Sequence, residues 1–426
     1  MRTRSAPAVI FSAVTTSSAS SGGLYGIGTS GTATRHTGAF SDLNRSSASA
    51  AAAGLGGAST SALAQKSKPL PGYAAYKDAN RVIVHSNNTI ETKRSAFGTS
   101  VVVPDDILYV RNNLPAPNSM IVADRDAWEV SIEGVRNPRK ITVGELKKIG
   151  VQTVAAVLQC SGNGRAFFQH KASGTQWSVG AAGCVIWSGV PVVAVVEAMG
   201  GLVDGRRFMT GSGGEKLPAG VDAKSVMVER SVPLEATETA LLAWEMNGEP
   251  LPVAHGGPLR LVIPGYYGVN SVKYLSRMEF AEKETLAKIQ TSGYRMRAIG
   301  QGGKPNQPSM WEMNVKSWIN HPGGMVRAGM VQIDGVAFGG MTGIRTVEVS
   351  VDGGKTWNEA QLIGPDLGKY AWRQFVFAAQ LKPGSYVLAS RATDEDGNTQ
   401  LVERIENHRG YGHNGWRDHS LKITVS

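Results

Sequence analysis

Residues 151–165 read VQTVAAVLQCSGNGR, an apolar, β-branched run that passes directly into a turn rich in Gly and Asn. A short apolar run of this composition is typical of a buried strand. Cys160 follows the run at once, so we expect the strand end to hold its sulfur rigidly toward the turn. The turn amides and Arg165, five residues later, would favour the thiolate form.

Three interpretations of Cys160 stay open on these residues alone: an inert core cysteine, a nucleophile or a metal ligand, because thiolate serves both chemistries. The other cysteine, Cys184, lies in an apolar stretch and is predicted to be buried. Two cysteines exclude a disulfide scaffold, a four-Cys zinc site and a Cys-ligated iron–sulfur cluster. The chain has no CxxCH motif, so we expect no covalently attached c-type haem.

The composition of the 426 residues is that of a globular protein, with 42 % hydrophobic and 18 % charged residues. The 52 glycines favour a turn-rich β or α+β protein. The formal charge is +10, but Lys and Arg are scattered, which suits a small anionic substrate better than nucleic acid. The weakly charged segment Gly180–Val203 contains Glu197 and Pro191, so we expect buried core and no membrane span.

Residues 1–64 are rich in Ser, Ala, Gly and Thr, and they differ from the rest of the chain. The small residues Ala62 and Ala64 fit a signal-peptidase site, although the apolar stretch before them is poor. We expect a disordered export or targeting-like segment and therefore a periplasmic protein. The alternatives are a later translation start and a disordered tail without a targeting role.

Two further regions are expected after this segment. Residues 65–288 mix short strands and helices, with helices at Thr142–Ile149 and Pro191–Met199 and a hairpin at Leu241–Pro252. Residues 289–426 contain alternating strands such as Thr346–Val351 and Ser385–Arg391, separated by turn signals. The predicted fold is α+β: a mixed α/β domain followed by a C-terminal immunoglobulin-like β-sandwich.

Two other polar groups attract attention. Tyr109–Pro115 (YVRNNLP) reads as a polar loop before a rigid proline, in which Arg111 could equally be a surface arginine. The segment from His255 to Tyr274 places His, Arg, Ser and Lys beside Gly-bounded turns. Backbone amides with cations are what a phosphate group requires. The alternative is a glycine-rich connection with solvated charges.

Together these motifs resemble the sulfite oxidase family of molybdenum enzymes, most closely its bacterial sulfite dehydrogenases. LQCSGNGR resembles the family's LQCAGNRR, and RNNLP resembles RNHLP. AWEMNGEPLP, HGGPLRLVIPG and GVNSVKYL follow in the family's order, and VSVDGGKTW and NGW resemble its C-terminal dimerisation domain. The resemblance covers roughly residues 65–426 and implies a molybdopterin-binding catalytic domain at 65–288 and a dimerisation domain at 289–426.

The resemblance also implies roles for individual residues. Cys160 would be the thiolate ligand of a molybdenum–molybdopterin cofactor, and Tyr294, with Arg111 and Arg165, would be catalytic. Residues implied in substrate binding are Arg111, Arg165, Trp177 and Arg417. Residues implied in cofactor binding are Val110, Arg111, Asn112, Asn113, Cys160, Asp222, His255, Arg260, Ser271, Val272 and Lys273.

The implied activity is oxidation of sulfite to sulfate, with electrons passed to cytochrome c or to a small c-type cytochrome subunit. We also expect a homodimer as one form of assembly. Alternatives are a related enzyme that acts on sulfane sulfur or sulfoxides, and a non-catalytic assembly protein. Two departures from the family pattern are Asn113 in place of His and Gly164 in place of a second arginine. His321–Gly324 (HPGG) resembles a cytochrome b5 string, but its surroundings do not, so no haem is expected on this chain.

Overall fold

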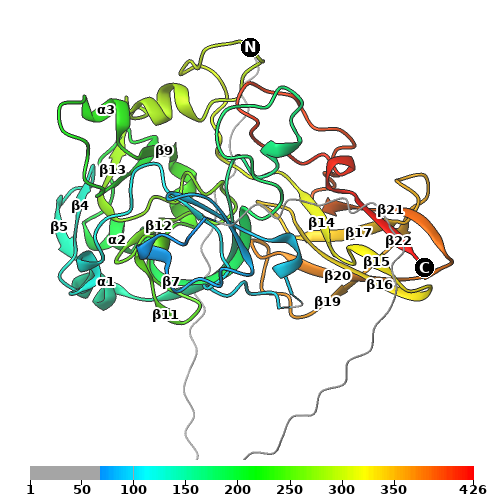
Figure 1. Ribbon diagram of the computed structural model, residues 1–426. Coiled ribbons are helices and arrows are strands. Elements are labelled where there is room, and N and C mark those ends of the chain that lie inside the picture. The colour runs from blue at the N-terminus through cyan, green and yellow to red at the C-terminus, as the bar shows by residue number, and fades with distance from the viewer. Residues whose placement is uncertain (1–67, 99) are drawn as a thin grey trace, which may run out of the picture. The chain divides into compact units, whose positions relative to one another are not determined.

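The computed structural model describes residues 68–98 and 100–426 of the chain, shown in Figure 1. The segment 1–64, for which we predicted export, lies outside the described residues. Three sheets use residues 82–281 and two more use residues 316–425. The expected boundary at 288/289 falls between the two groups and stays a prediction in its exact position.

The sheet that carries Cys160 has the order β11-β10-β7-β6, with β12 paired to β10. All its central pairs are antiparallel. Its strands are β6 (Gln152–Gln159), β7 (Ala182–Pro191), β10 (Leu241–Met246), β11 (Glu249–Pro250) and β12 (Arg260–Val262). The predicted strand before Cys160 and the hairpin around Asn247-Gly248 are therefore confirmed.

Two more sheets complete the first part of the chain. One has the order β1-β2-β3 and the other β5-β4-β13-β8-β9. Their strands are β1 (Val82–Ser86), β2 (Thr89–Thr92), β3 (Val110–Arg111), β4 (Glu129–Glu133), β5 (Arg139–Thr142), β8 (Phe208–Gly213), β9 (Glu229–Pro233) and β13 (Leu275–Ala281).

The helices are short, namely α1 (Val143–Ile149), α2 (Val192–Ala198) and α3 (Ala223–Val226). Helices α1 and α2 confirm the two predicted from the sequence, and α3 was not predicted. The Thr142 side chain accepts a hydrogen bond from the Glu145 amide, and the Glu145 carboxylate accepts one from the Thr142 amide, which forms a capping box at the start of α1. Pro191 precedes α2, where its fixed φ suits a helix start.

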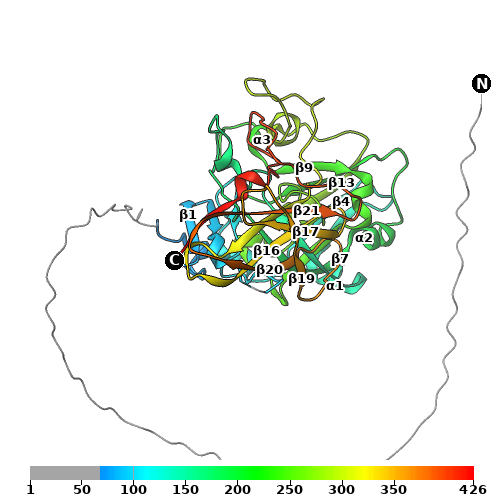
Figure 2. The same ribbon diagram turned by 90° about the vertical axis from the view of Figure 1, so that its right-hand side faces the viewer.

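The C-terminal part is a β-sandwich, visible in yellow to red in Figures 1 and 2. Its sheets have the orders β14-β16-β20-β19 and β15-β22-β21-β17-β18. Their strands are β14 (Lys316–His321), β15 (Gly324–Val326), β16 (Gly329–Phe338), β17 (Ile344–Ser350), β18 (Asn358–Glu359), β19 (Gln361–Ile363), β20 (Arg373–Leu381), β21 (Gly384–Asp394) and β22 (Leu421–Val425). The predicted two-part fold is confirmed, with more β-structure than helix.

A shared core joins the sandwich to the first part of the chain. The buried rings of Trp318 and Trp372 pack against Phe97, at centroid distances of 6.0 and 5.7 Å. The Trp372 indole nitrogen donates to the Val101 carbonyl at 2.6 Å, and Arg94 donates to the carbonyl of Ile319 at 2.6 Å. The two parts therefore meet through apolar packing as well as polar contacts, and the site described next lies beside this junction.

None of the helices in residues 68–98 and 100–426 is long and apolar enough to span a lipid bilayer.

Candidate active site

The turn after β6 holds Cys160 in a fixed position. The Cys160 amide donates to the Ala181 carbonyl at 2.9 Å, and the Cys160 carbonyl accepts from the Asn163 amide at 2.9 Å. The Asn163 side chain accepts from the Ala181 amide at 3.1 Å. These bonds tie the turn to the start of β7, so the thiol, 8 % exposed, faces a pocket in a rigid frame. Cys184, in contrast, is fully buried, and burial raises the pKa of its thiol to about 12.

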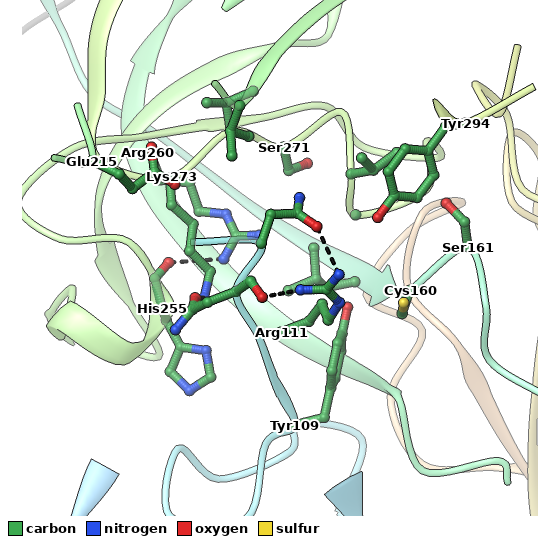
Figure 3. A pocket seen from close by; sticks show the side chains of 17 residues that line it. Tyr109, Arg111, Cys160, Ser161, Glu215, His255, Arg260, Ser271, Lys273 and Tyr294 are labelled. Carbon is green, nitrogen blue, oxygen red and sulfur yellow. Dashed lines mark hydrogen bonds between the residues drawn. The ribbon is translucent and has the colours of Figure 1, made fainter. Parts of the chain in front are cut away.

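The pocket encloses about 630 Å³, including its open mouth. Figure 3 shows Glu215, His255, Arg260 and Lys273 at one end, Cys160, Ser161 and Tyr294 at the other, and Arg111 between them. The lining residues are Tyr109, Arg111, Asn112, Asn113, Leu158, Cys160, Ser161, Glu215, Val228, His255, Arg260, Gly268, Val269, Ser271, Val272, Lys273 and Tyr294. Ten of the fifteen residues named from the sequence are therefore in one cavity.

Two cations line the first end, Arg260 buried and Lys273 half-buried. Arg260, 2 % exposed, donates from Nη1 to the His255 carbonyl at 2.8 Å, and its Nε has no partner within the described part of the chain. Lys273 donates to Asn112 Oδ1 at 2.7 Å and to the Ala254 carbonyl at 2.6 Å. These partners are neutral oxygens. Burial lowers the pKa of Arg260 to about 10 and that of Lys273 well below its ordinary value. Glu215 is the one carboxyl group that the described residues place in the lining, and burial raises its pKa. It therefore offsets only part of the positive charge, and this excess favours binding of an anion.

His255 is neutral at physiological pH, because burial and the neighbouring Lys77 ammonium lower its pKa to about 3. Its Nε2 lies 2.9 Å from Asp105 Oδ1 and 3.2 Å from Lys77 Nζ. Lys77 is itself held by the carbonyls of Asp105 and Leu108 at 2.6 and 2.8 Å. The imidazole is therefore fixed from behind by two residues that the sequence did not indicate.

Arg111 lies between the two ends, on β3 and the loop after it. Its guanidinium donates to the Asn112 carbonyl and, at 2.7 Å, to Asn113 Oδ1. Asn113, which stands where the family usually has His, thus orients Arg111 through a neutral acceptor. Val110 is fully buried behind this loop, outside the cavity lining.

Tyr294 forms the wall of the second end. Its ring stacks on Tyr411 with 5.1 Å between centroids and 8° between planes, and the Arg230 guanidinium lies 5.6 Å from its centroid. Burial and the Tyr411 phenol raise the pKa of Tyr294 to about 12, whereas Arg111 and Arg165 lower it. The phenol is therefore a neutral hydrogen-bond donor at physiological pH.

Arg165 and Trp177 lie directly behind the cavity rather than in its lining. Arg165, 6 % exposed, donates from Nε to the Arg409 carbonyl and from Nη1 to the Thr175 carbonyl, both at 2.9 Å. The fully buried Trp177 ring meets Tyr109 edge-on at 6.3 Å. Trp177 therefore buttresses Tyr109, which faces the pocket, whereas Arg165 packs against the loop that carries Arg409 and Tyr411.

The structure does not bring Asp222 or Arg417 to the pocket. Asp222 is exposed at the start of α3, beyond a loop whose length made its placement from sequence loose. Arg417 is exposed in the C-terminal part and pairs with Glu403. Its assignment as a cation for the substrate is not supported, because this ion pair holds it at the surface.

The C-terminal part contributes residues that sequence reasoning missed. Lys316 on β14, 1 % exposed, donates to the Asn163 carbonyl at 3.2 Å, and burial lowers its pKa to about 7. Gly164 has φ +95°, and a Cβ there would lie 2.6 Å from the His413 ring. The glycine that replaces an arginine of the family turn thus makes room for His413. No local signal links residues 316 and 413 to this turn, whereas Ser161, beside Cys160, could have been found.

Within the described residues, no group of three or more His, Cys, Asp and Glu side chains is arranged to hold a metal ion.

Residues 115–289 match the oxidoreductase molybdopterin binding domain, and residues 307–426 match the Mo-co oxidoreductase dimerisation domain.

Three known proteins are similar over most of the chain. The chain is 31 % identical to sulfite oxidase from Arabidopsis thaliana over 366 residues, which cover 78 % of this chain and 91 % of that protein. It is 32 % identical to mitochondrial sulfite oxidase from Mus musculus, and the match covers 76 % of this chain but only 62 % of the mouse protein. The sulfane dehydrogenase SoxCD from Paracoccus pantotrophus superimposes with a TM-score of 0.67 at 25 % identity, covering 79 % of this chain and 86 % of that one.

Proposed function

The chain belongs to the sulfite oxidase family of molybdopterin oxidoreductases, and from that premise we propose that it oxidises sulfite to sulfate and passes the electrons to cytochrome c.

The cofactor of this family domain is molybdenum–molybdopterin, and the pocket fits it. The unpartnered Nε of Arg260 and the neutral partners of Lys273 suit the cofactor's phosphate. Asn112 Nδ2 is also buried without a partner among the described residues. His255, Ser271 and the backbone around Val272 would complete this cradle, and Cys160 would supply the thiolate ligand. When bound, the cofactor supplies two-electron oxidation with oxygen transfer.

The residues at the other end suit a small oxyanion. Sulfite carries one or two negative charges near neutral pH, so its capture calls for fixed guanidinium donors. Arg111 faces the pocket, and Arg165, outside the lining, has its position fixed by two carbonyls. The neutral Tyr294 phenol would donate a hydrogen bond to the substrate or product.

The observation that carries the proposal is one cavity that combines the Cys160 thiol with three cations bonded to neutral oxygens, Arg111, Arg260 and Lys273. It also argues against a non-catalytic assembly protein, because the cations of this lining outnumber Glu215, its one carboxyl group among the described residues, and such an excess reduces stability unless a ligand offsets it. The test is metal analysis of the purified protein followed by sulfite-dependent reduction of cytochrome c. Stoichiometric molybdenum with no oxidation of sulfite by cytochrome c or ferricyanide would refute the proposal.

A second candidate is oxidation of sulfane sulfur, supported by the structural similarity to sulfane dehydrogenase SoxCD and by the neutral Asn113 beside Arg111. Comparison of turnover with sulfite, a protein persulfide and a sulfoxide separates the candidates. We expect the highest kcat/KM with sulfite, since two fixed arginines favour an oxyanion.

We further propose that the protein is exported to the periplasm and forms a homodimer through the C-terminal domain, or binds a small cytochrome subunit there. The match to a dimerisation domain supports the assembly. Light scattering of the purified chain tests the dimer, and fractionation of cells that express the full-length chain tests the export. A monomer that pulls down no cytochrome, or a protein that remains in the cytoplasm, would overturn the respective proposal.

A further inference from the structure

Tyr411 contacts two residues at the substrate end of the pocket, although it belongs to the C-terminal part of the chain. Its ring stacks on Tyr294 at 5.1 Å, and the Arg165 guanidinium lies 5.3 Å from its centroid. Tyr294 and Arg165 come from segments that are 129 positions apart in the sequence. The Tyr411 ring therefore contacts both Tyr294 and Arg165, two residues that are far apart in the sequence.

The loop that carries Tyr411 is fixed by its backbone. The Asn407 side chain accepts from the Tyr411 amide at 3.0 Å and donates to the Tyr411 carbonyl at 2.9 Å. On the turn after Cys160, the Gly412 amide donates to the Ser161 carbonyl at 2.9 Å. The 3 % exposed ring thus has little freedom to move without the turn.

The close approach of this loop depends on Gly410. Its φ is +61°, and a Cβ there would lie 2.9 Å from Arg165 Cγ. Only glycine adopts this conformation without strain and leaves room for the arginine stem. The loop is therefore shaped to pass directly over Arg165, which donates to the carbonyl of Arg409 just before it.

The Arg165 guanidinium is held by two of its three nitrogens. Its Nε and Nη1 bind backbone carbonyls, and Nη2 lies over Gly162, where any side chain would collide with the guanidinium. A cation packed on an aromatic face is held in orientation by the ring's quadrupole. The Tyr411 ring therefore fixes the plane of the guanidinium as well as the plane of the Tyr294 phenol.

We propose that Tyr411 is a positioning residue of the substrate site, through which the C-terminal domain sets the relative placement of Tyr294 and Arg165. The proposal rests on the proposed function, because it assigns the residue to capture of the sulfur oxyanion. The positioning comes from the contacts of the Tyr411 ring with Tyr294 and Arg165, and it does not require the Tyr411 hydroxyl.

The test compares Tyr411→Leu with Tyr411→Phe in the cofactor-loaded chain. Steady-state kinetics with sulfite and ferricyanide give kcat and KM, and calorimetric titration with sulfate gives oxyanion affinity without turnover. We expect Tyr411→Leu to raise the sulfite KM and weaken sulfate binding about tenfold or more, because small misplacements of positioned groups are costly. Tyr411→Phe should stay within about threefold of the parent, since it keeps the stack.

The matched control is Tyr386→Leu on β21, whose hydroxyl donates to the Lys382 carbonyl away from the pocket. It should leave KM, sulfate affinity and molybdenum content unchanged. Parental sulfate affinity in Tyr411→Leu would overturn the proposal, and so would loss of molybdenum from that variant or an equal defect in Tyr411→Phe. A parent that binds sulfate but does not oxidise sulfite would refute the proposed function alone. A parent that oxidises sulfite but binds no sulfate would leave the proposed function intact, and equal sulfite KM values for the parent and Tyr411→Leu would then overturn the positioning role.

Discussion

The two ends of the pocket are built in different ways. His255, Arg260, Ser271 and Lys273, which we call the cofactor end, come from one continuous segment around β12. The opposite end, which we call the substrate end, holds Tyr294, with Arg111 between it and the cofactor end and Arg165 just outside the lining. These three residues come from separate segments, and Tyr411 of the C-terminal domain packs on Tyr294 and Arg165. The first end is local in sequence, and the second is assembled only by the tertiary fold.

The side chains of the two ends are also stabilised in different ways. At the cofactor end, the cations hydrogen-bond to neutral oxygens, and Glu215 is the one carboxyl group that residues 68–98 and 100–426 contribute to the lining, so an anion from outside the chain would stabilise them. At the substrate end, Arg165 and Tyr294 are held by carbonyls and stacked rings that the protein provides itself. Substitutions at the cofactor end should therefore lower the pterin and molybdenum content of the protein. Substitutions at the substrate end should weaken its affinity for the oxyanion.

The largest effect is expected at Cys160, which lies at the same end of the pocket as Tyr294. Cys160→Ser should abolish turnover, because a serine hydroxyl is a far weaker ligand for a soft metal than thiolate. The measurement is sulfite oxidation together with molybdenum content. Cys184→Ala, which alters the buried cysteine of β7, is the control and should retain turnover. A Cys160→Ser protein with full metal content and parental activity would refute the ligand assignment.

The next effect concerns retention of the cofactor. Lys273→Met removes a half-buried ammonium from the cofactor end, and we expect it to weaken cofactor retention about 30-fold or more, as for loss of one partner of a hydrogen-bonded charge pair. Pterin and molybdenum content after gel filtration measure this. The sulfite KM of the fraction that remains loaded should be parental. A fully loaded variant would show that Lys273 does not hold the cofactor. A raised sulfite KM in the loaded fraction would show that Lys273 also affects oxyanion binding, so that the two ends do not have separate roles.

The cofactor end could be predicted from the sequence because its residues and turns follow one another within 255–274. The same is true of the capping box at Thr142, of β6 and of the hairpin at Asn247-Gly248, whose signals are local. The approach of Tyr411 to Tyr294 could not be predicted, since nothing local links residues separated by more than a hundred positions. Arg417 was named because it follows a recognisable NGW string, but its ion pair with Glu403 shows that a nearby motif does not fix where a side chain lies.

A smaller effect is expected for the arginines of the substrate end. Arg165→Gln should raise the sulfite KM about 10- to 100-fold, because it removes a charge-assisted donor, and Arg111→Gln should act in the same direction. Cofactor content should stay parental in both, the reverse of the Lys273 result. Arg139→Gln, which alters an exposed arginine paired with Glu145, serves as control. Parental kinetics in both pocket variants would make these arginines structural, and loss of cofactor from Arg165→Gln would show that the two ends are coupled.

The smallest effect is expected in the pH dependence of the free energy of unfolding, at His413 behind the substrate end. Burial lowers the pKa of His413 from 6.5 to about 4, and Lys316 and Arg404 act in the same direction, against the Asp418 contact. The unfolded chain therefore takes up the proton first, so the stability that His413 contributes is present above pH 6.5 and is lost as pH falls toward 4. Between pH 7 and pH 5 this amounts to about 1–2 kcal/mol. His413→Gln should lose less stability over that interval in urea unfolding, and because other buried histidines titrate in both proteins, the difference between the two curves isolates His413. Parallel curves would mean that His413 has the same pKa in the folded protein as in the unfolded chain, so that burial beside the turn after Cys160 does not disfavour its charged form.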